Sequence, residues 1–322
     1  MKYLLFFYFV ITNFFLANSQ AYSELIYLKP YDNKGNQINE NENSLSQIKY
    51  DPDNLYSDVD DNIPKNNIVN EKTFAYVIGN ENYSNHQTVR YAKHDARIFN
   101  KYLIKTFGID SCHISYYENA KYSNLLDILT DINDKKKFFK GDETFIFYYA
   151  GHGLPDEKTK SASLLGSDAN KSNSSATFAL SDLYYKLAEC PNKAVIIFLD
   201  ACFSGAVRST DETDMLALSR GVRIKPNKDK IPGNLVVFSA CSGDETALPY
   251  EQKKHGMFTY FLLKKIKETN GNVNLEDLSK YVIDEVLYNS NVKNKKSQNP
   301  QINTNSSFEN NWKNIKLLNR SK

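Results

Sequence analysis

The sequence has few cysteines and little net charge, and each of these shortages excludes a class of protein. Four cysteines in 322 residues are too few for a disulfide scaffold, and no C-x-x-C pair offers the spacing of a structural zinc site. The 40 Lys and Arg residues nearly balance 38 Asp and Glu residues, so no global field favours nucleic acid or an anionic membrane. Gly79 and Gly108 lack phosphate-binding spacing, which disfavours a nucleotide site.

The one long apolar run lies at the N-terminus. Met1-Lys2 precede the run from Tyr3 to Leu16, and the small and polar residues Ala17-Asn18-Ser19-Gln20 follow it. A basic start, an apolar stretch too short for a membrane span and a small-residue exit are typical of a secretory signal peptide. We therefore expect residues 1–19 to be removed, leaving a secreted or periplasmic protein without stable membrane insertion. The alternative is a short amphipathic or buried N-terminal helix.

A segment of different composition follows the predicted signal peptide. Residues 20–71 are crowded with Asn, Asp, Glu and Ser and show little apolar periodicity. Such composition supplies little apolar surface for a core. We interpret this segment as a linker or a removable pro-segment, and residues 72–322 as one domain.

Residues 72–322 alternate between strand and helix patterns. Apolar runs predict strands at Phe74–Gly79, His113–Tyr117, Thr144–Ala150, Ala194–Leu199 and Leu235–Ser239. Helical spacing predicts helices around Ala92–Leu103, Leu125–Ile132, Leu183–Leu187, Phe258–Ile266 and Leu275–Val286, with Ser181 and Asn274 as N-caps. This alternation indicates an α/β fold, with a mostly parallel central sheet and helices on both faces. Ligand sites in such folds lie at the carboxyl ends of the strands.

His152 and Cys202 each come directly after the apolar core of a predicted strand. His152 stands between Gly151 and Gly153, and Cys202 lies in the run Asp200-Ala201-Cys202-Phe203-Ser204-Gly205. A cysteine acts as a nucleophile when it is a thiolate, and a neighbouring histidine takes or balances its proton. The two glycines allow close backbone approach and N–H groups for an oxyanion. The separation of about 50 residues matches the spacing described for caspases.

These residues, in this order, resemble the caspase-like cysteine peptidases, which include caspases, metacaspases and bacterial relatives. The resemblance runs from Lys72 to Lys316. Its motifs are Tyr76-Val77-Ile78-Gly79-Asn80, Tyr91-Ala92-Lys93-His94-Asp95-Ala96, Tyr148-Tyr149-Ala150-Gly151-His152-Gly153, Phe198-Leu199-Asp200-Ala201-Cys202-Phe203-Ser204-Gly205, Phe238-Ser239-Ala240 and His255-Gly256-Met257-Phe258-Thr259.

The resemblance implies a caspase-like fold and a cysteine-type endopeptidase acting on peptide or protein substrates. It implies that Cys202 is the nucleophile, that His152 is the general base and acid, and that the backbone N–H groups of Gly153 and Cys202 form the oxyanion hole. In the metacaspase-type branch, aspartates at the positions of Asp200 and Asp95 line the S1 pocket. Because carboxylates bind guanidinium and ammonium groups strongly, we expect Arg or Lys at P1. Asp200 could instead accept backbone N–H groups in its own loop.

The resemblance also bears on cofactors and processing. We expect no cofactor and no metal ligands. Calcium activation stays an open alternative without support, since Leu154 to Asp168 lacks the dense acidic cluster that binds calcium in calcium-dependent metacaspases. Residues 208–230 form a long polar connection rich in Lys and Arg, and in caspases the equivalent stretch is cut. We hypothesise that this zymogen cleaves itself there after a basic residue. The alternative is an ordinary surface loop.

The remaining cysteines and histidines have no clear partners in the sequence. With Cys202 reserved for catalysis, at most one disulfide can form among Cys112, Cys190 and Cys241. Four further histidines are interpreted as surface or packing residues without a partner pattern: His86, His94, His113 and His255.

The leading hypothesis is therefore a secreted cysteine endopeptidase with a Cys-His dyad. The first alternative, from a different class, is a catalytically inactive caspase-fold protein that acts by protein binding. The second is an exported cysteine hydrolase that acts on a non-peptide acyl group. The sequence leaves the oligomeric state open.

Overall fold

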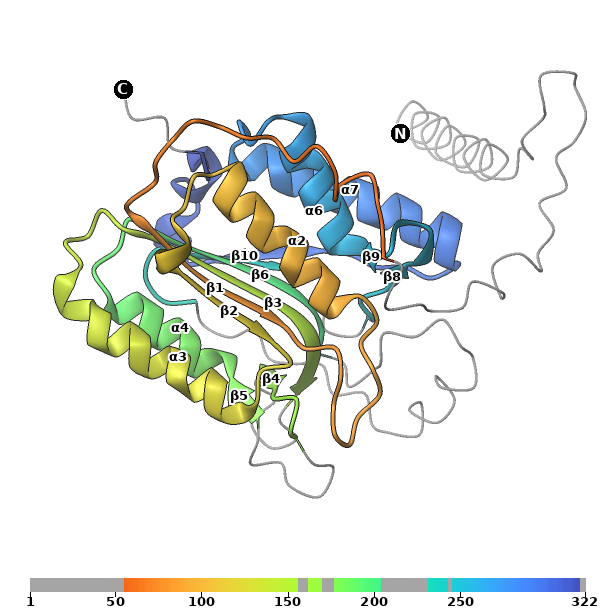
Figure 1. Ribbon diagram of the computed structural model, residues 1–322, viewed down its shortest axis with the longest axis horizontal. Coiled ribbons are helices and arrows are strands. Elements are labelled where there is room, and N and C mark those ends of the chain that lie inside the picture. Colours follow the sequence, from red (N-terminus) through yellow and green to blue (C-terminus); the bar gives the residue numbers. More distant parts are fainter. Residues whose placement is uncertain (1–54, 156–161, 170–176, 204–230, 243–244, 319–322) are drawn as a thin grey trace, which may run out of the picture. The chain divides into compact units, whose positions relative to one another are not determined.

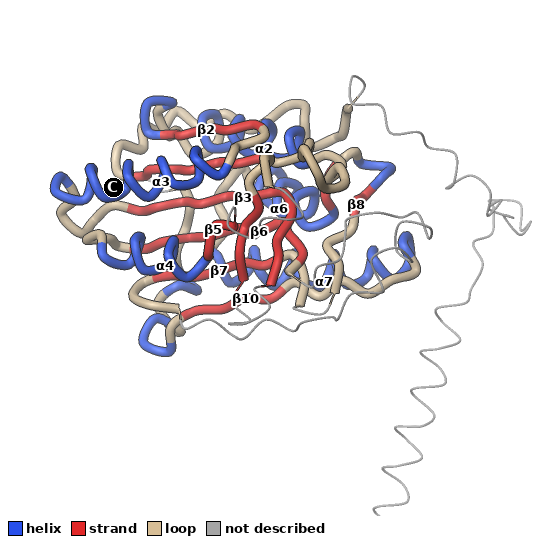
Figure 2. The backbone as a smooth tube through the Cα atoms, turned by 90° about the horizontal axis from the view of Figure 1, so that it is seen from below, coloured by secondary structure: helices blue, strands red, loops and turns tan. Residues whose placement is uncertain are grey.

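A six-stranded path forms the centre of the fold in the computed structural model, which describes residues 55–155, 162–169, 177–203, 231–242 and 245–318. The strand order is β10-β7-β6-β3-β1-β2. Figure 2, seen from below, shows this order from β2 at one edge to β10 at the other. All neighbours pair in parallel except β10, which is antiparallel to β7. The strands are β1 (Thr73–Gly79), β2 (Ile114–Glu118), β3 (Thr144–Pro155), β6 (Ala194–Cys202), β7 (Leu235–Ser239) and β10 (Gln301–Thr304).

Helices cover both faces of this sheet, as Figure 1 shows. Helices α2 (Ala92–Lys105), α6 (Met257–Glu268) and α7 (Leu275–Asn294) pack on one face, and α3 (Tyr122–Lys135) and α4 (Leu180–Glu189) on the other. The predicted α/β fold with a mostly parallel sheet is confirmed.

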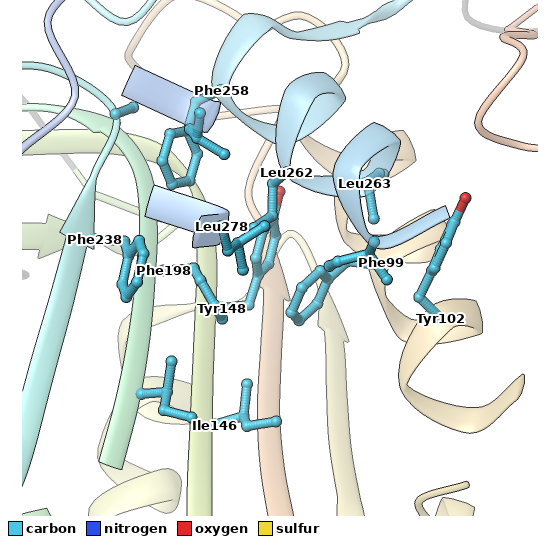
Figure 3. Close-up of a cluster of buried hydrophobic side chains, with 14 of the residues drawn as sticks. Phe99, Tyr102, Ile146, Tyr148, Phe198, Phe238, Phe258, Leu262, Leu263 and Leu278 are labelled. Carbon is cyan, nitrogen blue, oxygen red and sulfur yellow. The ribbon is translucent and has the colours of Figure 1, made fainter. Parts of the chain in front are cut away.

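The burial of the strands on two sides explains this layering. In β3, Ile146 and Tyr148 belong to the core under α2, α6 and α7, whereas Phe145 and Phe147 belong to the core under α3 and α4. Side chains alternate between the faces of a strand, so a strand that is apolar at every position needs cover on both faces. Figure 3 shows the first core, where Tyr148 lies among side chains of neighbouring strands and helices.

Several elements lie outside the sequence predictions. Two short strands, β4 (Ala162–Leu165) and β5 (Thr177–Ala179), extend from β3, and β8 (Pro249–Tyr250) pairs with β9 (His255–Gly256). Single turns of 3₁₀ helix occur at Ser111–His113, Lys136–Phe138, Glu251–Lys253, Ser306–Phe308 and Trp312–Asn314.

The two predicted helix caps have different outcomes. Asn274 caps α7, and its side chain accepts a hydrogen bond from the backbone N–H of Asp277. The prediction for Ser181 is wrong, because α4 begins at Leu180 after the N-cap residue Ala179. Ser181 therefore lies inside the first turn, where its side chain cannot occupy the capping position.

The described end of the predicted linker, residues 55–71, packs on the helices. Val59 is fully buried, and its carbonyl accepts a hydrogen bond from the Tyr102 hydroxyl at 2.8 Å. The Asn66 side chain donates to the carbonyl of Thr106 at 2.8 Å. The predicted domain boundary at residue 71 stays a prediction, but these contacts make residues 55–71 part of the packed structure. Within the ranges described above, no helix is both long and apolar enough to cross a bilayer.

Candidate active site

The structure brings His152 and Cys202 together at the carboxyl ends of two neighbouring strands. His152 on β3 is the register partner of Cys202 on β6. The parallel strands place both residues at the same edge of the sheet, where side chains from successive strand ends converge. Their side chains are almost buried, with 7% of His152 and 4% of Cys202 exposed.

Backbone and tyrosine groups orient the His152 ring. Its Nε2 atom lies 2.7 Å from the carbonyl oxygen of Gln87. A carbonyl can only accept, so Nε2 carries the hydrogen and Nδ1 is the nitrogen that can take a proton. The backbone N–H of His152 donates to the Tyr83 hydroxyl at 2.8 Å, and the Tyr83 ring centroid lies 4.7 Å from that of His152.

Aromatic side chains account for the two glycines that flank His152. A Cβ atom at Gly151 would lie 2.7 Å from the hydroxyl oxygens of both Tyr83 and Tyr149. A Cβ at Gly153 would lie 2.6 Å from ring carbons of Phe203. Any side chain at either position would displace groups that hold the site together. The oxyanion role of Gly153 stays a prediction.

Cys202 has a hydrogen-bond donor and a second thiol beside it. The backbone N–H of Ala247 donates to Cys202 Sγ at 2.7 Å. The Cys241 thiol lies next to Cys202 and donates to the carbonyls of Ala201, at 3.6 Å, and Glu245, at 3.5 Å. Interaction with Cys202, together with burial, raises the pKa of the Cys241 thiol well above its ordinary value. Cys241 therefore stays protonated beside Cys202.

Asp200 lies against the first turn of α6. Its Oδ2 atom accepts hydrogen bonds from the Thr259 hydroxyl at 2.6 Å and from the Thr259 backbone N–H at 3.3 Å. The Thr259 hydroxyl in turn lies 2.7 Å from the hydroxyl of Tyr148. The alternative role for Asp200 was the acceptance of backbone N–H groups in its own loop. Asp200 does accept a backbone N–H group, but this group belongs to Thr259 on α6.

Asp95 contacts the same helix terminus from α2. Its carboxylate accepts the backbone N–H of Gly256 at 3.0 Å and lies 2.7 Å from Nδ1 of His255. Both predicted S1 carboxylates are fully buried, and the N-terminus of a helix stabilises negative charge. The S1 role of Asp95 and Asp200 stays a prediction.

The caspase-domain family model matches residues 72–311. The chain belongs to the caspase-domain family. A protein of Geobacter sulfurreducens with a crystal structure is 16% identical, with a TM-score of 0.51 over 74% of this chain and 96% of its own. Caspase-1 from Spodoptera frugiperda is 14% identical, with a TM-score of 0.51 over 78% of this chain and 94% of its own. At these identities the similarity shows the fold alone. A search of curated protein sequences found no match.

Within this caspase-domain chain, the sequence predictions missed two neighbours of His152 and Cys202. Gln87 acts through its backbone carbonyl, which every residue type has, so its identity carries no signal. Cys241 lies 39 positions from Cys202 in the sequence, and only the pairing of β6 with β7 brings the two together. All four cysteines are free.

The interpretation of His94 and His255 as residues without partners is wrong. His255 is fully buried, with Nδ1 facing Asp95 and Nε2 lying 2.9 Å from Asp60 Oδ1. His94 Nε2 lies 3.0 Å from the other oxygen of Asp60. Burial opposes a charge on His255, but hydrogen bonds to Asp60 and Asp95 outweigh it and raise the pKa of His255 to about 9. Sequence reasoning missed this network because Asp60 lies in the presumed linker.

The other two histidines have different surroundings. The His113 ring packs against Phe74 with centroids 4.4 Å apart, as a packing residue would. The His86 ring is partly exposed, and its centroid lies 6.1 Å from that of His152.

Two processing predictions fall on residues outside those described. The signal peptide at residues 1–19 and the cleavage loop at residues 208–230 both belong to that group. Part of the segment from Leu154 to Asp168 also lies outside the described residues, so the calcium expectation stays a prediction.

Proposed function

We propose that this caspase-domain protein is a cysteine endopeptidase with Cys202 as its nucleophile and His152 as its general base and acid. The observation that carries the proposal is the register of His152 with Cys202 at the sheet edge, with the imidazole oriented by Gln87. A histidine held in this tautomer presents Nδ1 as its basic nitrogen, which is what a Cys-His pair requires.

In the proposed reaction, His152 takes the thiol proton and the Cys202 sulfur attacks the peptide carbonyl carbon. The negative oxygen of the tetrahedral intermediate is stabilised by the backbone N–H groups of Gly153 and Cys202. The C–N bond then breaks, His152 gives its proton to the leaving amine, and a thioester remains. Water, deprotonated by His152, attacks the thioester to release the new carboxylate and the thiol.

We propose Arg or Lys at P1, with Asp200 and Asp95 as the carboxylates of the S1 pocket. A charge-assisted hydrogen bond to a substrate cation contributes ~1.5–3 kcal/mol. The position of Asp200 two residues before Cys202 supports this proposal. Because Asp200 also binds Thr259, a substrate cation must share the carboxylate with α6.

The decisive experiment measures hydrolysis of fluorogenic peptides with Arg, Lys, Asp or Asn at P1, with and without calcium. We expect cleavage after Arg or Lys by the wild type and none by Cys202→Ala. Cleavage after Asp but not Arg would overturn the S1 proposal while leaving the peptidase proposal standing. No cleavage of any peptide by a folded protein would favour the inactive, protein-binding alternative.

The role of Asp200 is separated from its contact with α6 by a pair of variants. Asp200→Asn removes the charge, and Thr259→Val removes the hydroxyl that binds it. We expect Asp200→Asn to lower kcat/KM for a P1 Arg peptide about tenfold or more relative to a P1 Gln peptide, as the loss of ~1.5–3 kcal/mol implies. If Thr259→Val changed that ratio equally, Asp200 would have a structural role through its contact with α6 and not a role in binding the substrate cation.

Export and self-processing are proposed on the sequence patterns. We propose export directed by residues 1–19, and N-terminal sequencing of the exported protein should show a start near Gln20. We propose self-cleavage within residues 208–230 after a basic residue. Identical fragment patterns of the wild type and Cys202→Ala on a gel would rule out self-cleavage.

A further inference from the structure

Three side chains from distant parts of the sequence place metal-ligand atoms together on the face of the sheet that α2, α6 and α7 cover. Asp60 comes from the segment before β1, His94 from the first turn of α2, and His255 from β9. One ligand atom from each lies within 4.8 Å of the other two. The His94 and His255 rings are buried, and the side chain of Asp60 is 9% exposed. None of these residues has a role in the proposed peptidase reaction.

The two imidazoles converge on one carboxylate. His94 Nε2 lies 3.0 Å from Asp60 Oδ2, and His255 Nε2 lies 2.9 Å from Asp60 Oδ1. Two imidazole nitrogens and one carboxylate oxygen form a donor set typical of zinc and related transition metals, whereas Ca²⁺ and Mg²⁺ prefer oxygen alone.

Asp95 supplies the supporting contact that metal-binding histidines usually have. Its Oδ1 atom lies 2.7 Å from Nδ1 of His255. A ligating histidine commonly donates its other ring N–H to a carboxylate, which fixes the tautomer and turns the free nitrogen toward the metal. Here the same contact leaves Nε2 of His255 directed at Asp60.

The charges also suit a divalent cation. Asp60 and Asp95 bring two carboxylates into a nearly enclosed space, and a divalent ion bound in place of the His255 proton balances both. The adjacent lysines are engaged with other groups of the same segment. Lys253 contacts the Asp58 carboxylate at 2.7 Å, and Lys267 contacts the carbonyls of Asp58 and Asp61.

We propose that Asp60, His94 and His255 form a binding site for a divalent transition-metal ion of the zinc type, with Asp95 as the residue that orients His255. Water fills the fourth position of a tetrahedral ion with three protein ligands. The ion replaces the hydrogen bonds that the two Nε2 atoms make with Asp60. The ion links the segment before β1 to α2 and, through His255, to the start of α6. In the first turn of α6, the backbone N–H of Thr259 donates a hydrogen bond to Asp200 on β6.

The test uses Co²⁺ and Zn²⁺ with the full chain carrying Cys202→Ala, so that the reactive thiol is not a competing ligand. We expect one Co²⁺ per chain with weak visible bands of nitrogen and oxygen ligands and without sulfur-to-cobalt charge transfer. We also expect competition by Zn²⁺ and a higher melting temperature with the ion bound. Charge-transfer bands alone would place the metal on a cysteine and overturn the proposal.

Variants in the same background locate the ion. We expect His94→Gln and Asp60→Asn to abolish binding of one Co²⁺ per chain, and Asp95→Asn to weaken it ~10–100-fold, as loss of a supporting contact does. His113→Gln, in which a histidine that packs on Phe74 is changed, is the matched control and should bind normally. Absence of Co²⁺ and Zn²⁺ binding by the folded parent, shown by circular dichroism, would make the cluster a network of ion pairs only. Unchanged binding by a folded His94→Gln would place the ion elsewhere.

Discussion

Cys202 Sγ accepts a hydrogen bond from the backbone N–H of Ala247 at 2.7 Å. An N–H donor stabilises a thiolate more than a thiol, so this contact favours ionisation of Cys202, the proposed nucleophile. Ala247 lies in the segment between β7 and β8, and the donor belongs to the backbone, so only a change that removes the N–H tests it.

We expect Ala247→Pro to raise the pKa of Cys202. Loss of a hydrogen bond to a charged group costs ~1.5–3 kcal/mol, equivalent to ~1–2 pKa units. The pH dependence of alkylation of Cys202 by iodoacetamide measures this shift. Ala247→Gly keeps the N–H and should leave the midpoint of the curve unchanged. An unaltered midpoint in a folded Ala247→Pro protein would contradict the role assigned to the N–H.

The Gln87 contact predicts a neutral substitution close to His152, the proposed catalytic histidine. Gln87 holds His152 through its backbone carbonyl, and its side chain is exposed. Gln87→Ala should therefore keep kcat within a factor of ~2 of the wild type, because the acceptor and the His152 tautomer persist. Steady-state kinetics on the best peptide substrate would check this. A much larger drop in kcat would show that the Gln87 side chain itself takes part.

Tyr83→Phe provides the contrasting substitution. It removes the hydroxyl that accepts the backbone N–H of His152. A buried donor without a partner costs ~1–3 kcal/mol, so we expect lower stability together with lower kcat as the His152 backbone shifts. Urea denaturation measures the first and peptide hydrolysis the second. A variant as stable and as active as the wild type would mean that another group accepts this N–H.

The hydrogen-bonded chain Tyr148, Thr259 and Asp200 predicts two graded losses of stability. Tyr148→Phe removes one hydroxyl at the end of the chain and should cost ~0.5–1.5 kcal/mol. Thr259→Val removes the central hydroxyl, which leaves both Asp200 and Tyr148 without that partner, and should cost more than ~2 kcal/mol. Urea denaturation curves of the two variants give these values. The reverse order would indicate that Asp200 is held chiefly by other contacts.

The parts of the fold that the sequence predicted are those with a strong local pattern. Strand β7 has the predicted bounds Leu235–Ser239, and Asn274 caps α7 as expected. Continuous apolar runs and a capping asparagine are local signals that no distant residue needs to complete. By contrast, β10 is polar and only partly buried, and it exists through its pairing with β7.

The same distinction applies to the site. Glycines and strand ends identify His152 and Cys202 because the chemistry depends on those residue types. The Gln87 carbonyl, the Cys241 thiol and the pairing of His255 with Asp60 depend on long-range contacts. A polar segment such as residues 55–71 resembles a linker in composition, because Val59 is its one fully buried apolar residue and only Ile63 and Ile68 pack partly buried beside the core.

The packing of residues 55–71 limits where a removable pro-segment can end. A chain that starts at Leu55 keeps Val59 and Asp60 and should unfold at the same urea concentration as the chain that starts at Gln20. A chain that starts at Lys72 loses ~1.5–3 kcal/mol for burial of Val59. It also leaves the buried Tyr102 hydroxyl without its acceptor, which costs ~1–3 kcal/mol more.

Urea denaturation of the truncated chains, in a chelator so that no metal contributes, measures these differences. Val59→Ala in the chain that starts at Leu55 serves as a partial control and should cost ~2 kcal/mol through lost apolar contact and an unfilled cavity. Equal stability of the chains starting at Leu55 and Lys72 would restore the linker interpretation for residues 55–71. The expected loss would instead require any activating cleavage of the pro-segment to fall before Val59, because a later cut would release the residues that join α2 to α6.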